Sequence, residues 1–274
     1  MFSINSKITL NNGVKIPLLG LGTYLMKPGN ETYNACLWAL EVGYRHIDTA
    51  AFYKNESDVG KAIRDSGINR QDVFITTKIW NDDQGYENTL KAVDRSLHLL
   101  GFDYVDLILI HWPVPKLRKE TWKALERVYD EGLCSAIGVS NYTISHLQEL
   151  FNYANVIPVV NQVEFSPFLY QKELLEFCEN NNIKIEAYSP LARGRKFDHP
   201  LLVELSKKYD KTPAQIMIRW ALQIGTIVIP KSSKKERIIE NASVFDFEIS
   251  SEDMKRLNSL HEGYRVAWNP ENIE

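Results

Sequence analysis

The chain lacks any long hydrophobic run. In its 274 residues the apolar stretches, such as "LILI" at 107–110, fall far short of the roughly 20 residues that span a bilayer. The amino-terminal segment "MFSINSKITLNNG" also has no apolar core of the kind that a signal peptide carries. These two absences predict a cytoplasmic protein that does not bind membranes.

The chain also has few cysteines and no large excess of charge of either sign. Only three cysteines occur, Cys36, Cys134 and Cys178, and they are far apart and set in apolar or helical surroundings. This pattern favours reduced thiols over disulfides or a metal cluster. Lys and Arg number 32 against 35 Asp and Glu, with no long run of either sign, so no nucleic acid partner is expected. Small-molecule chemistry is the better expectation.

The motifs of two common hydrolase classes are missing too. The sequence has no G-x-S-x-G nucleophile elbow, no H-E-x-x-H, and no group of carboxylates and histidines at metal-ligand spacing. Hydrolysis by a serine or by zinc therefore has little support, and no metal is expected.

What the chain does contain is one organisation repeated along its length. Short β-rich runs alternate with longer amphipathic ones such as "NETYNACLWALEVG" and "KETWKALERVYDEG", several of which end on Gly or Asn as helices do. Thr212 and Pro213 predict a helix start, and Gly225 predicts its end. The runs predicted as strands are 18–23, 44–49, 73–78, 105–111, 135–140, 159–163, 183–188 and 226–230.

Eight apolar strands alternating with helices describe a parallel sheet that is buried on both faces. In a chain of this size the closed (β/α)8 TIM barrel is the natural solution, and no linker or shift in composition divides residues 1–274 into more than one domain. Asn12 and Gly13, between two β-rich pieces, predict an N-terminal β-hairpin that covers the bottom of the barrel.

Polar groups stand at almost every predicted strand end. In a barrel these ends meet at one mouth, so residues far apart in sequence are expected to lie close together. Each position alone has an ordinary explanation, such as a helix cap for Asp48 or a solvent-reaching Lys78, but packing does not explain the joint pattern. The residues at strand ends are Asp48, Lys78, His111, Ser140, Asn141, Gln162, Tyr188, Lys231 and Ser232.

Three of these residues, together with Tyr53 shortly after the strand that ends at Asp48, suggest proton transfer to a carbonyl. The phenol of Tyr53, with an ordinary pKa of about 10, is a poor proton donor near neutrality unless a neighbouring ammonium lowers its pKa, and Lys78 is expected to do so. Asp48 supplies the counter-charge that Lys78 needs in a pocket. His111 can donate a hydrogen bond to a polarised carbonyl oxygen beside the phenol.

Seven motifs along nearly the whole chain resemble those of the aldo-keto reductase family, in the family's order and spacing. They are "GYRHIDTAAFYKNESDVGKAI", "FITTKIW", "VDLILIHWP", "AIGVSN", "NQVEFSP", "AYSPLA" and "IPKSSKKERIIEN". The connections after His111 and Tyr188 are short, and in this the chain resembles bacterial and protozoan members of the 2,5-diketo-gluconate reductase and prostaglandin F synthase-like kind. The resemblance implies a barrel that binds NADPH without a Rossmann fold, which suits the incomplete G-x-G-x-x-G in "GLGTYL" at 20–25.

The resemblance also implies roles for individual residues. Tyr53 resembles the proton donor, Lys78 and Asp48 the pair that tunes it, and His111 the residue that orients the carbonyl. The residues implied in cofactor binding are Thr23, Asp48, Ser140, Asn141, Gln162, Tyr188, Ser189, Leu191, Lys231, Ser232, Ser233, Arg237, Glu240 and Asn241. Those expected to wall the substrate site are Tyr24, Trp80, His111, Trp112 and Trp268, although core packing explains each aromatic equally well.

The residues from Lys231 to Arg237 predict a site for a phosphate group without reference to the family. Ser233 and Glu236 have capping-box spacing, which predicts a helix that starts just after Ser233. Lys234 and Lys235 would then lie in its first turn, where positive charge opposes the helix dipole, so a bound phosphate is expected to compensate. Lys231, Ser232 and Arg237 resemble the family's contacts to the 2′-phosphate of NADPH. A merely solvated basic face is the alternative.

Two function classes remain open. The first is a monomeric NADPH-dependent carbonyl reductase, for which small aldehydes, keto sugars, prostaglandin-like compounds or quinones are possible substrates. The second is a regulatory NADPH-binding barrel with slow turnover, and the full set of four catalytic residues favours the enzyme. Arg193 and Arg195 stand in a loop where many family members have small or acidic residues, so closure over the cofactor is expected to differ.

Overall fold

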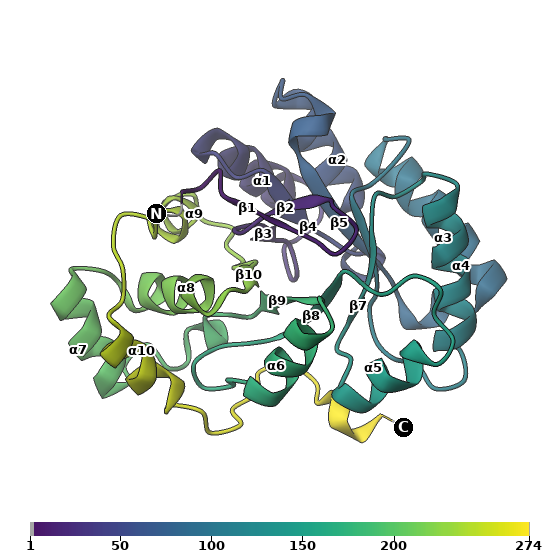
Figure 1. Cartoon of the computed structure of the whole chain (residues 1–274). Helices are drawn as coiled ribbons and strands as arrows, with labels where there is room; N and C mark the ends of the chain where they lie inside the picture. Colours follow the sequence, from purple (N-terminus) through teal and green to yellow (C-terminus); the bar gives the residue numbers. More distant parts are fainter. Residues whose placement is uncertain (1–2, 274) are drawn as a thin grey trace.

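The computed structural model describes residues 3–273, and eight parallel strands form its centre (Figure 1). Each strand pairs with the next one along the chain. The strands are β3 (Leu21–Gly22), β4 (His46–Asp48), β5 (Phe74–Ile79), β6 (Leu107–Ile110), β7 (Ile137–Ser140), β8 (Val160–Glu164), β9 (Lys184–Tyr188) and β10 (Ile227–Val228). All eight predicted strands are present, and those shorter than predicted are β3, β4, β6, β7, β9 and β10.

The sheet closes on itself between its first and last strands. The amide of Gly20 donates to the carbonyl of Val228 at 2.9 Å, and the amide of Val228 donates to the carbonyl of Leu18 at 2.9 Å. A parallel bridge between Gly22 and Lys231 continues this seam toward the mouth. These bonds complete a barrel, so the predicted (β/α)8 fold is confirmed.

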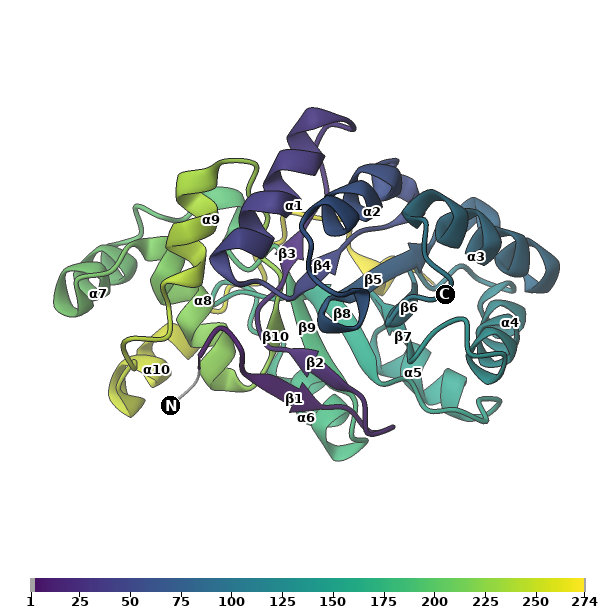
Figure 2. The same ribbon diagram turned by 90° about the horizontal axis from the view of Figure 1, so that it is seen from above.

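Helices surround the strands, as Figures 1 and 2 show from two directions. They are α1 (Asn30–Val42), α2 (Glu56–Asp65), α3 (Tyr86–Leu100), α4 (Arg118–Asp130), α5 (Ile144–Phe151), α6 (Lys172–Asn180), α7 (Pro200–Tyr209), α8 (Pro213–Ile224), α9 (Lys235–Ala242) and α10 (Ser251–Asn258). The loops hold short 3-10 turns: η1 (Ala51–Tyr53), η2 (Arg70–Asp72), η3 (Asn81–Asp83), η4 (Ala192–Gly194) and η5 (Pro270–Asn272). In residues 3–273 no helix is long and apolar enough to cross a membrane.

Helix α8 shows why local sequence sets these boundaries. The hydroxyl of Thr212 accepts the amide of Gln215 at 3.3 Å, and the side chain of Gln215 accepts the amide of Thr212 at 2.9 Å. This reciprocal cap satisfies amides that lack a partner in the first turn. Gly225 ends the helix with φ at 99°, a left-handed conformation that glycine adopts without strain. The predicted start and end of α8 are confirmed.

The antiparallel hairpin β1 (Lys7–Thr9) and β2 (Lys15–Pro17) closes the end of the barrel opposite the mouth. Gly13 turns the chain with φ at 88°. Leu10 and Ile16 pack against Phe74 and Leu107, which begin β5 and β6. The hairpin therefore covers the N-terminal ends of the strands, as predicted.

The three cysteines are free and buried. Burial raises the pKa of each thiol to about 12, so they stay protonated core side chains at neutral pH. That all described residues form one domain stays a prediction.

Candidate active site

Four side chains predicted to act together meet at the carboxyl ends of the strands. Asp48 ends β4, Lys78 lies one residue before the end of β5, and His111 follows β6 directly. Tyr53 closes η1, the short 3-10 turn that comes after β4. The barrel therefore brings all four groups to one mouth, although the sequence separates them widely.

Lys78 is the centre of the group. Its ammonium donates to Asp48 Oδ1 at 2.7 Å, to the carbonyl of Thr49 at 2.9 Å and to the hydroxyl of Tyr53 at 3.3 Å. Lys78 has no exposed surface and Asp48 is 2% exposed, so this ion pair is screened from water. Burying a charge is costly unless a counter-charge and hydrogen bonds compensate it, and Asp48 and Thr49 do so. A fixed cation therefore lies beside the phenol.

The pKa of Tyr53 is not lowered, contrary to the expectation from sequence. Burial raises it well above its ordinary value, and the negative charges of Asp48 and Glu186 act in the same direction. The expectation is wrong because burial disfavours the charged phenolate, and because the carboxylate of Asp48 opposes the effect of the Lys78 ammonium. Tyr53 keeps its proton in the resting site, which is the state that a proton donor requires.

His111 is a neutral imidazole in this site. Burial lowers its pKa well below the usual range, and the ammonium of Lys78 acts in the same direction. The ring centroid lies 5.7 Å from that of Tyr53 and 5.1 Å from that of Trp80. Within residues 3–273, His111 Nδ1 has no hydrogen-bond partner. A neutral imidazole can donate one N–H, so His111 can orient an oxygen beside Tyr53 without adding charge.

The ends of β7, β8 and β9 add a linked set of polar groups. Ser140 donates to the carbonyl of Gln162 at 2.8 Å, and Asn141 donates to the carbonyl of His111 at 3.0 Å. Tyr188 donates its hydroxyl proton to Asn141 Oδ1 at 2.8 Å. These contacts hold amide and hydroxyl groups at fixed places next to His111, as predicted for the strand ends.

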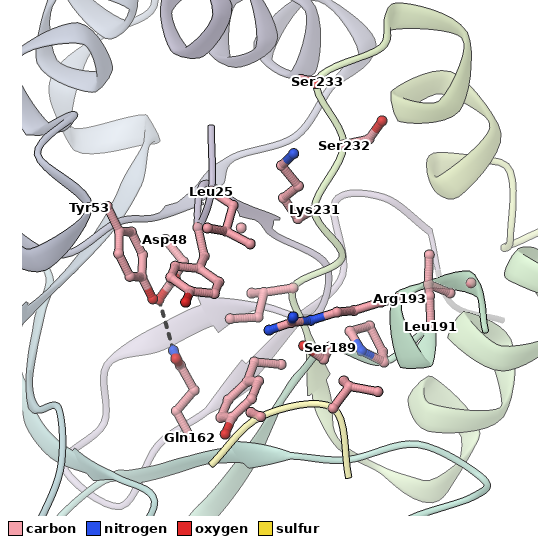
Figure 3. A pocket seen from close by; sticks show the side chains of 18 of the residues that line it. Leu25, Asp48, Tyr53, Gln162, Ser189, Leu191, Arg193, Lys231, Ser232 and Ser233 are labelled. Atoms are coloured by element: carbon pink, nitrogen blue, oxygen red, sulfur yellow. Dashed lines mark hydrogen bonds between the residues drawn. The ribbon is translucent and has the colours of Figure 1, made fainter. Parts of the chain in front are cut away.

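A cavity of about 1060 Å³ joins this group to the region after β10. In Figure 3 Tyr53, Asp48 and Gln162 lie at one end, Lys231 and Ser232 at the other, and Arg193 reaches between them. The predicted residues that line it are Tyr24, Asp48, Tyr53, Trp80, His111, Trp112, Ser140, Asn141, Gln162, Tyr188, Ser189, Leu191, Lys231, Ser232, Ser233, Arg237, Glu240, Asn241 and Trp268.

Two predicted residues lie behind this lining. Lys78 acts on the cavity only through Asp48 and Tyr53. Thr23 is fully buried, and its hydroxyl donates to the carbonyl of Asp48 at 2.9 Å. The neighbouring Gly22 and Tyr24 line the cavity instead.

At the phosphate end the predicted helix start is wrong. Helix α9 begins at Lys235, its N-cap is Lys234, and no side chain caps it. The hydroxyl of Ser232, rather than Ser233, accepts the amide of Lys234 at 3.2 Å, so a local turn replaces the predicted capping box. Lys235 pairs with Glu41 at 3.0 Å and lies outside the cavity lining, so it needs no phosphate to compensate it. Lys231, Lys234 and Arg237 remain at the cavity.

Aromatic rings form the outer wall of the mouth. The rings of Phe52 and Trp80 stack with centroids 3.8 Å apart and an interplanar angle of 18°. Trp268 lies 6.3 Å from Trp80 and 5.7 Å from Trp112, between ring centroids. Trp268 is 62% exposed, so this wall stands open to solvent. Of the four rings, Phe52 was not predicted.

Comparison with known proteins agrees with this geometry. The sequence profile of the aldo/keto reductase family matches residues 18–262. The chain belongs to the aldo/keto reductase family. The resemblance inferred from the motifs is thereby confirmed.

Curated relatives and solved structures agree with this assignment. The chain is 49% identical to a glyoxal reductase of Bacillus subtilis, over 99% of this chain and 98% of the relative. It is 50% identical to a 9,11-endoperoxide prostaglandin H2 reductase of Trypanosoma cruzi, over 97% of this chain and 95% of the relative. A silkworm (Bombyx mori) aldo-keto reductase complexed with NADPH superimposes with a TM-score of 0.91 at 36% identity, covering 96% of this chain and 90% of that one.

The cavity of this aldo/keto reductase fits NADPH. Neutral amide and hydroxyl groups lie at one end and cationic side chains at the other, in one continuous space that suits an elongated dinucleotide phosphate. Solved members of the family that contain NADPH support the same cofactor here. Within residues 3–273 no group of three or more His, Cys, Asp or Glu side chains could hold a metal ion.

The tail that carries Trp268 lies beyond the family match and is fixed by a buried carboxylate. Glu164 accepts the amide of Val266 at 2.6 Å and the amide of Ala267 at 3.1 Å. Burial raises the pKa of Glu164, while these two amides act against the rise. Glu164 ends β8, so the barrel itself positions the tail at the mouth.

Sequence reasoning missed the buried acid Glu186. Glu186 lies on β9 two residues before Tyr188, so both side chains point to the same side of the strand. Its side chain is fully buried and lies 2.7 Å from Gln162 Nε2. A glutamate within the apolar run "IKIEAY" is the signal that could have found it.

Proposed function

We propose that this chain uses NADPH to reduce aldehyde or ketone groups of small molecules to alcohols, with Tyr53 as the general acid. The observation that carries the proposal is the contact of a protonated, buried phenol with the Lys78–Asp48 ion pair. His111 lies beside the same phenol as a neutral hydrogen-bond donor.

The four residues divide the proton chemistry among them. NADPH, when bound, supplies the hydride. As negative charge grows on the substrate oxygen, Tyr53 donates its phenolic proton to that oxygen, and His111 donates an N–H to it. Lys78, 3.3 Å from the phenol oxygen, stabilises the phenolate that remains, and Asp48 holds Lys78 in place. A positioned general acid of this kind contributes a rate factor of about 10² to 10⁴.

The chemistry of the two ends of the cavity supports one orientation of the cofactor. Ser140, Asn141 and Gln162 offer donors and acceptors for a carboxamide, and Tyr188 offers a flat face for the nicotinamide ring. Lys231, Ser232 and Arg237 are the proposed contacts to the 2′-phosphate. The path between these ends is formed by Ser189, Leu191, Ser233, Glu240 and Asn241.

For the substrate we favour small aldehydes and dicarbonyls. The mouth is open and walled by Phe52, Trp80 and Trp268, with His111 and Tyr53 at its base. The relative named for glyoxal reduction, at 49% identity, supports the same substrate class. The stacked pair Phe52 and Trp80 offers a flat apolar surface, which favours quinones as a second candidate class.

We also propose that the chain acts as one domain and as a cytoplasmic monomer. One chain supplies every residue of the proposed site, so catalysis needs no second subunit. Light scattering with and without NADPH tests the oligomeric state.

The test of the function is a panel of aldehydes, ketones, dicarbonyls and quinones assayed by loss of nicotinamide absorbance, with NADPH and NADH in parallel. Rapid turnover of aldehydes or dicarbonyls with NADPH is the expected result. Tight NADPH binding without appreciable turnover on any member of the panel would contradict the reductase and favour the regulatory barrel.

A further inference from the structure

A second layer of polar side chains lies beneath the mouth. Glu186 of β9 is fully buried and does not line the cavity. His46 of β4 and Gln162 of β8 face it, with His46 Nε2 at 3.5 Å from Glu186 Oε1. His46 also contacts Thr76 of β5 at 3.1 Å. The proton transfer described above uses none of His46, Thr76 and Glu186, so their presence inside a barrel needs another explanation.

The key contact is made by Gln162. Its Nε2 donates to Asp48 Oδ2 at 2.8 Å and to Glu186 Oε2 at 2.7 Å (the first bond is drawn in Figure 3). A side-chain amide has two N–H donors, so both are used. Asp48, paired with Lys78, can only accept hydrogen bonds, which fixes the nitrogen of Gln162 on this side. The planar amide must then turn its oxygen away from the two carboxyl groups.

We propose that Glu186 is a positioning residue that locks the side chain of Gln162, so that its oxygen is presented to the nicotinamide carboxamide of NADPH. Asp48 alone leaves the amide free to rotate about one bond, whereas two acceptors define its plane. The proposal rests on the proposed placement of the nicotinamide at Gln162. This role would explain why an acid is buried at position 186, where an apolar side chain would cost less free energy to remove from water.

The charge of Glu186 depends on pH. Burial, and then the negative charge of Asp48, raise the pKa of Glu186 to about 8, while Gln162 and Lys78 act against the rise. His46 is neutral, because burial lowers its pKa to about 3. Tyr53, which also faces this layer, stays protonated. At neutral pH Glu186 is therefore a neutral acid, and above about pH 8 it adds a negative charge that favours the cationic ring of NADP⁺ over NADPH.

Two ligands and three variants test the positioning role. Dissociation constants are measured by calorimetry at neutral pH for NADPH and for adenosine 2′,5′-bisphosphate, which lacks the nicotinamide. Glu186→Met removes one acceptor and should weaken NADPH about tenfold, with the bisphosphate unchanged. Glu186→Gln keeps an acceptor oxygen of the same reach and should bind NADPH within about twofold of the parent. Gln162→Ala should weaken NADPH at least as much as Glu186→Met.

The outcomes separate this inference from the proposed function. If Glu186→Met binds NADPH as the parent does while Gln162→Ala binds it more weakly, only the proposed role of Glu186 is overturned. Parent-like binding by Gln162→Ala would overturn the nicotinamide placement and this inference with it. Equal weakening of both ligands by Glu186→Met would show a general structural role and would also overturn the proposal.

A pH series covers the case in which Glu186→Met does not fold. The affinities of parent and Glu186→Gln for NADP⁺ and NADPH are compared from about pH 6.5 to about pH 9. The parent should shift its preference several-fold toward NADP⁺ as pH rises through about 8, and Glu186→Gln should not. The same pH dependence in both proteins would contradict the placement of this acid beneath the nicotinamide.

Discussion

At the scale of single residues, the candidate active site depends on a buried ion pair. Lys78 and Asp48 are both removed from water, and their ammonium and carboxylate lie 2.7 Å apart. Removing one partner leaves the other charge buried without compensation, which typically costs about 3 to 5 kcal/mol. In the proposed mechanism the same pair therefore affects both stability and catalysis.

Lys78→Met should lower the free energy of unfolding by about 3 to 5 kcal/mol and slow turnover, because the buried Asp48 loses its counter-charge and Tyr53 loses the adjacent ammonium. Denaturant titration measures the first effect and the aldehyde assay the second. The double variant Lys78→Met with Asp48→Asn should recover part of the stability but none of the turnover. Equal stability of the parent and Lys78→Met would contradict the buried pair.

Under the proposed placement of NADPH, the choice between NADPH and NADH depends on single side chains. Arg237 lines the phosphate end of the cavity, whereas Lys235 is paired with Glu41 and does not line it. A hydrogen bond to a charged group contributes about 1.5 to 3 kcal/mol, so Arg237→Ala should weaken NADPH about tenfold to a hundredfold while leaving NADH nearly unchanged. Lys235→Ala is the matched control and should bind both as the parent does. Fluorescence titration checks this, and unchanged NADPH affinity in Arg237→Ala would refute the phosphate placement.

At the scale of elements, the barrel positions the tail through Glu164 at the end of β8. Its two carboxylate oxygens accept the amides of Val266 and Ala267, which hold Trp268 at the mouth. Glu164→Gln keeps the shape but retains only one acceptor oxygen for two amides.

We expect Glu164→Gln to raise KM for a small aldehyde about three- to tenfold with little change in kcat, because the tail walls the substrate site but does not touch the proton donor. Hydrogen exchange of the Val266 and Ala267 amides should accelerate in parallel. Glu176→Gln, on the exposed side of α6, is the control and should change neither KM nor the exchange of these two amides. Unchanged exchange at both amides would show that Glu164 does not fix the tail.

The sequence was a good guide to elements and a poorer one to their contacts. Alternating apolar runs located all eight strands, and Thr212, Pro213 and Gly225 located both ends of α8. The start of α9 was misplaced because two adjacent serines offer competing local turns, and the Ser232 turn forms instead of the Ser233 cap. Spacing along one chain cannot decide between such near-equal local hydrogen bonds.

Charge balance was harder still to predict. Burial raises the pKa of Tyr53 most, and Asp48 and Glu186 add to the rise although they come from β4 and β9 and meet only in the folded barrel. Glu186 is recognisable in sequence as a charged residue in an apolar strand, but its partner Gln162 lies on a different strand. The residue types of the site could therefore be predicted from the sequence, whereas their combined electrostatic effect on Tyr53 could not.

At the scale of the whole molecule, the buried acid makes stability depend on pH. The folded-state pKa of Glu186 is about 8, against 4.5 for an ordinary glutamate, so the folded state binds more protons between these values. Stability from this group is fully present below about pH 4.5 and is lost as pH rises toward about 8.

Glu186→Gln cannot ionise, so it should lose less stability than the parent between about pH 5 and about pH 8. The denaturation midpoints of the two proteins, measured across this range, check the prediction. Their difference should grow with pH and then level off above about pH 8. Parallel curves for the two proteins would contradict the raised pKa of Glu186.

The central claim, that this barrel reduces carbonyl groups with Tyr53 as the proton donor, is tested most directly by Tyr53→Phe. Only the hydroxyl is removed, so NADPH affinity should stay within about twofold of the parent while kcat/KM for an unactivated aldehyde falls at least about a hundredfold. Quinones, which need less help from a proton, should lose less. If Tyr53→Phe binds NADPH normally and reduces the aldehyde at the parent rate, Tyr53 is not the acid and the proposed mechanism is wrong.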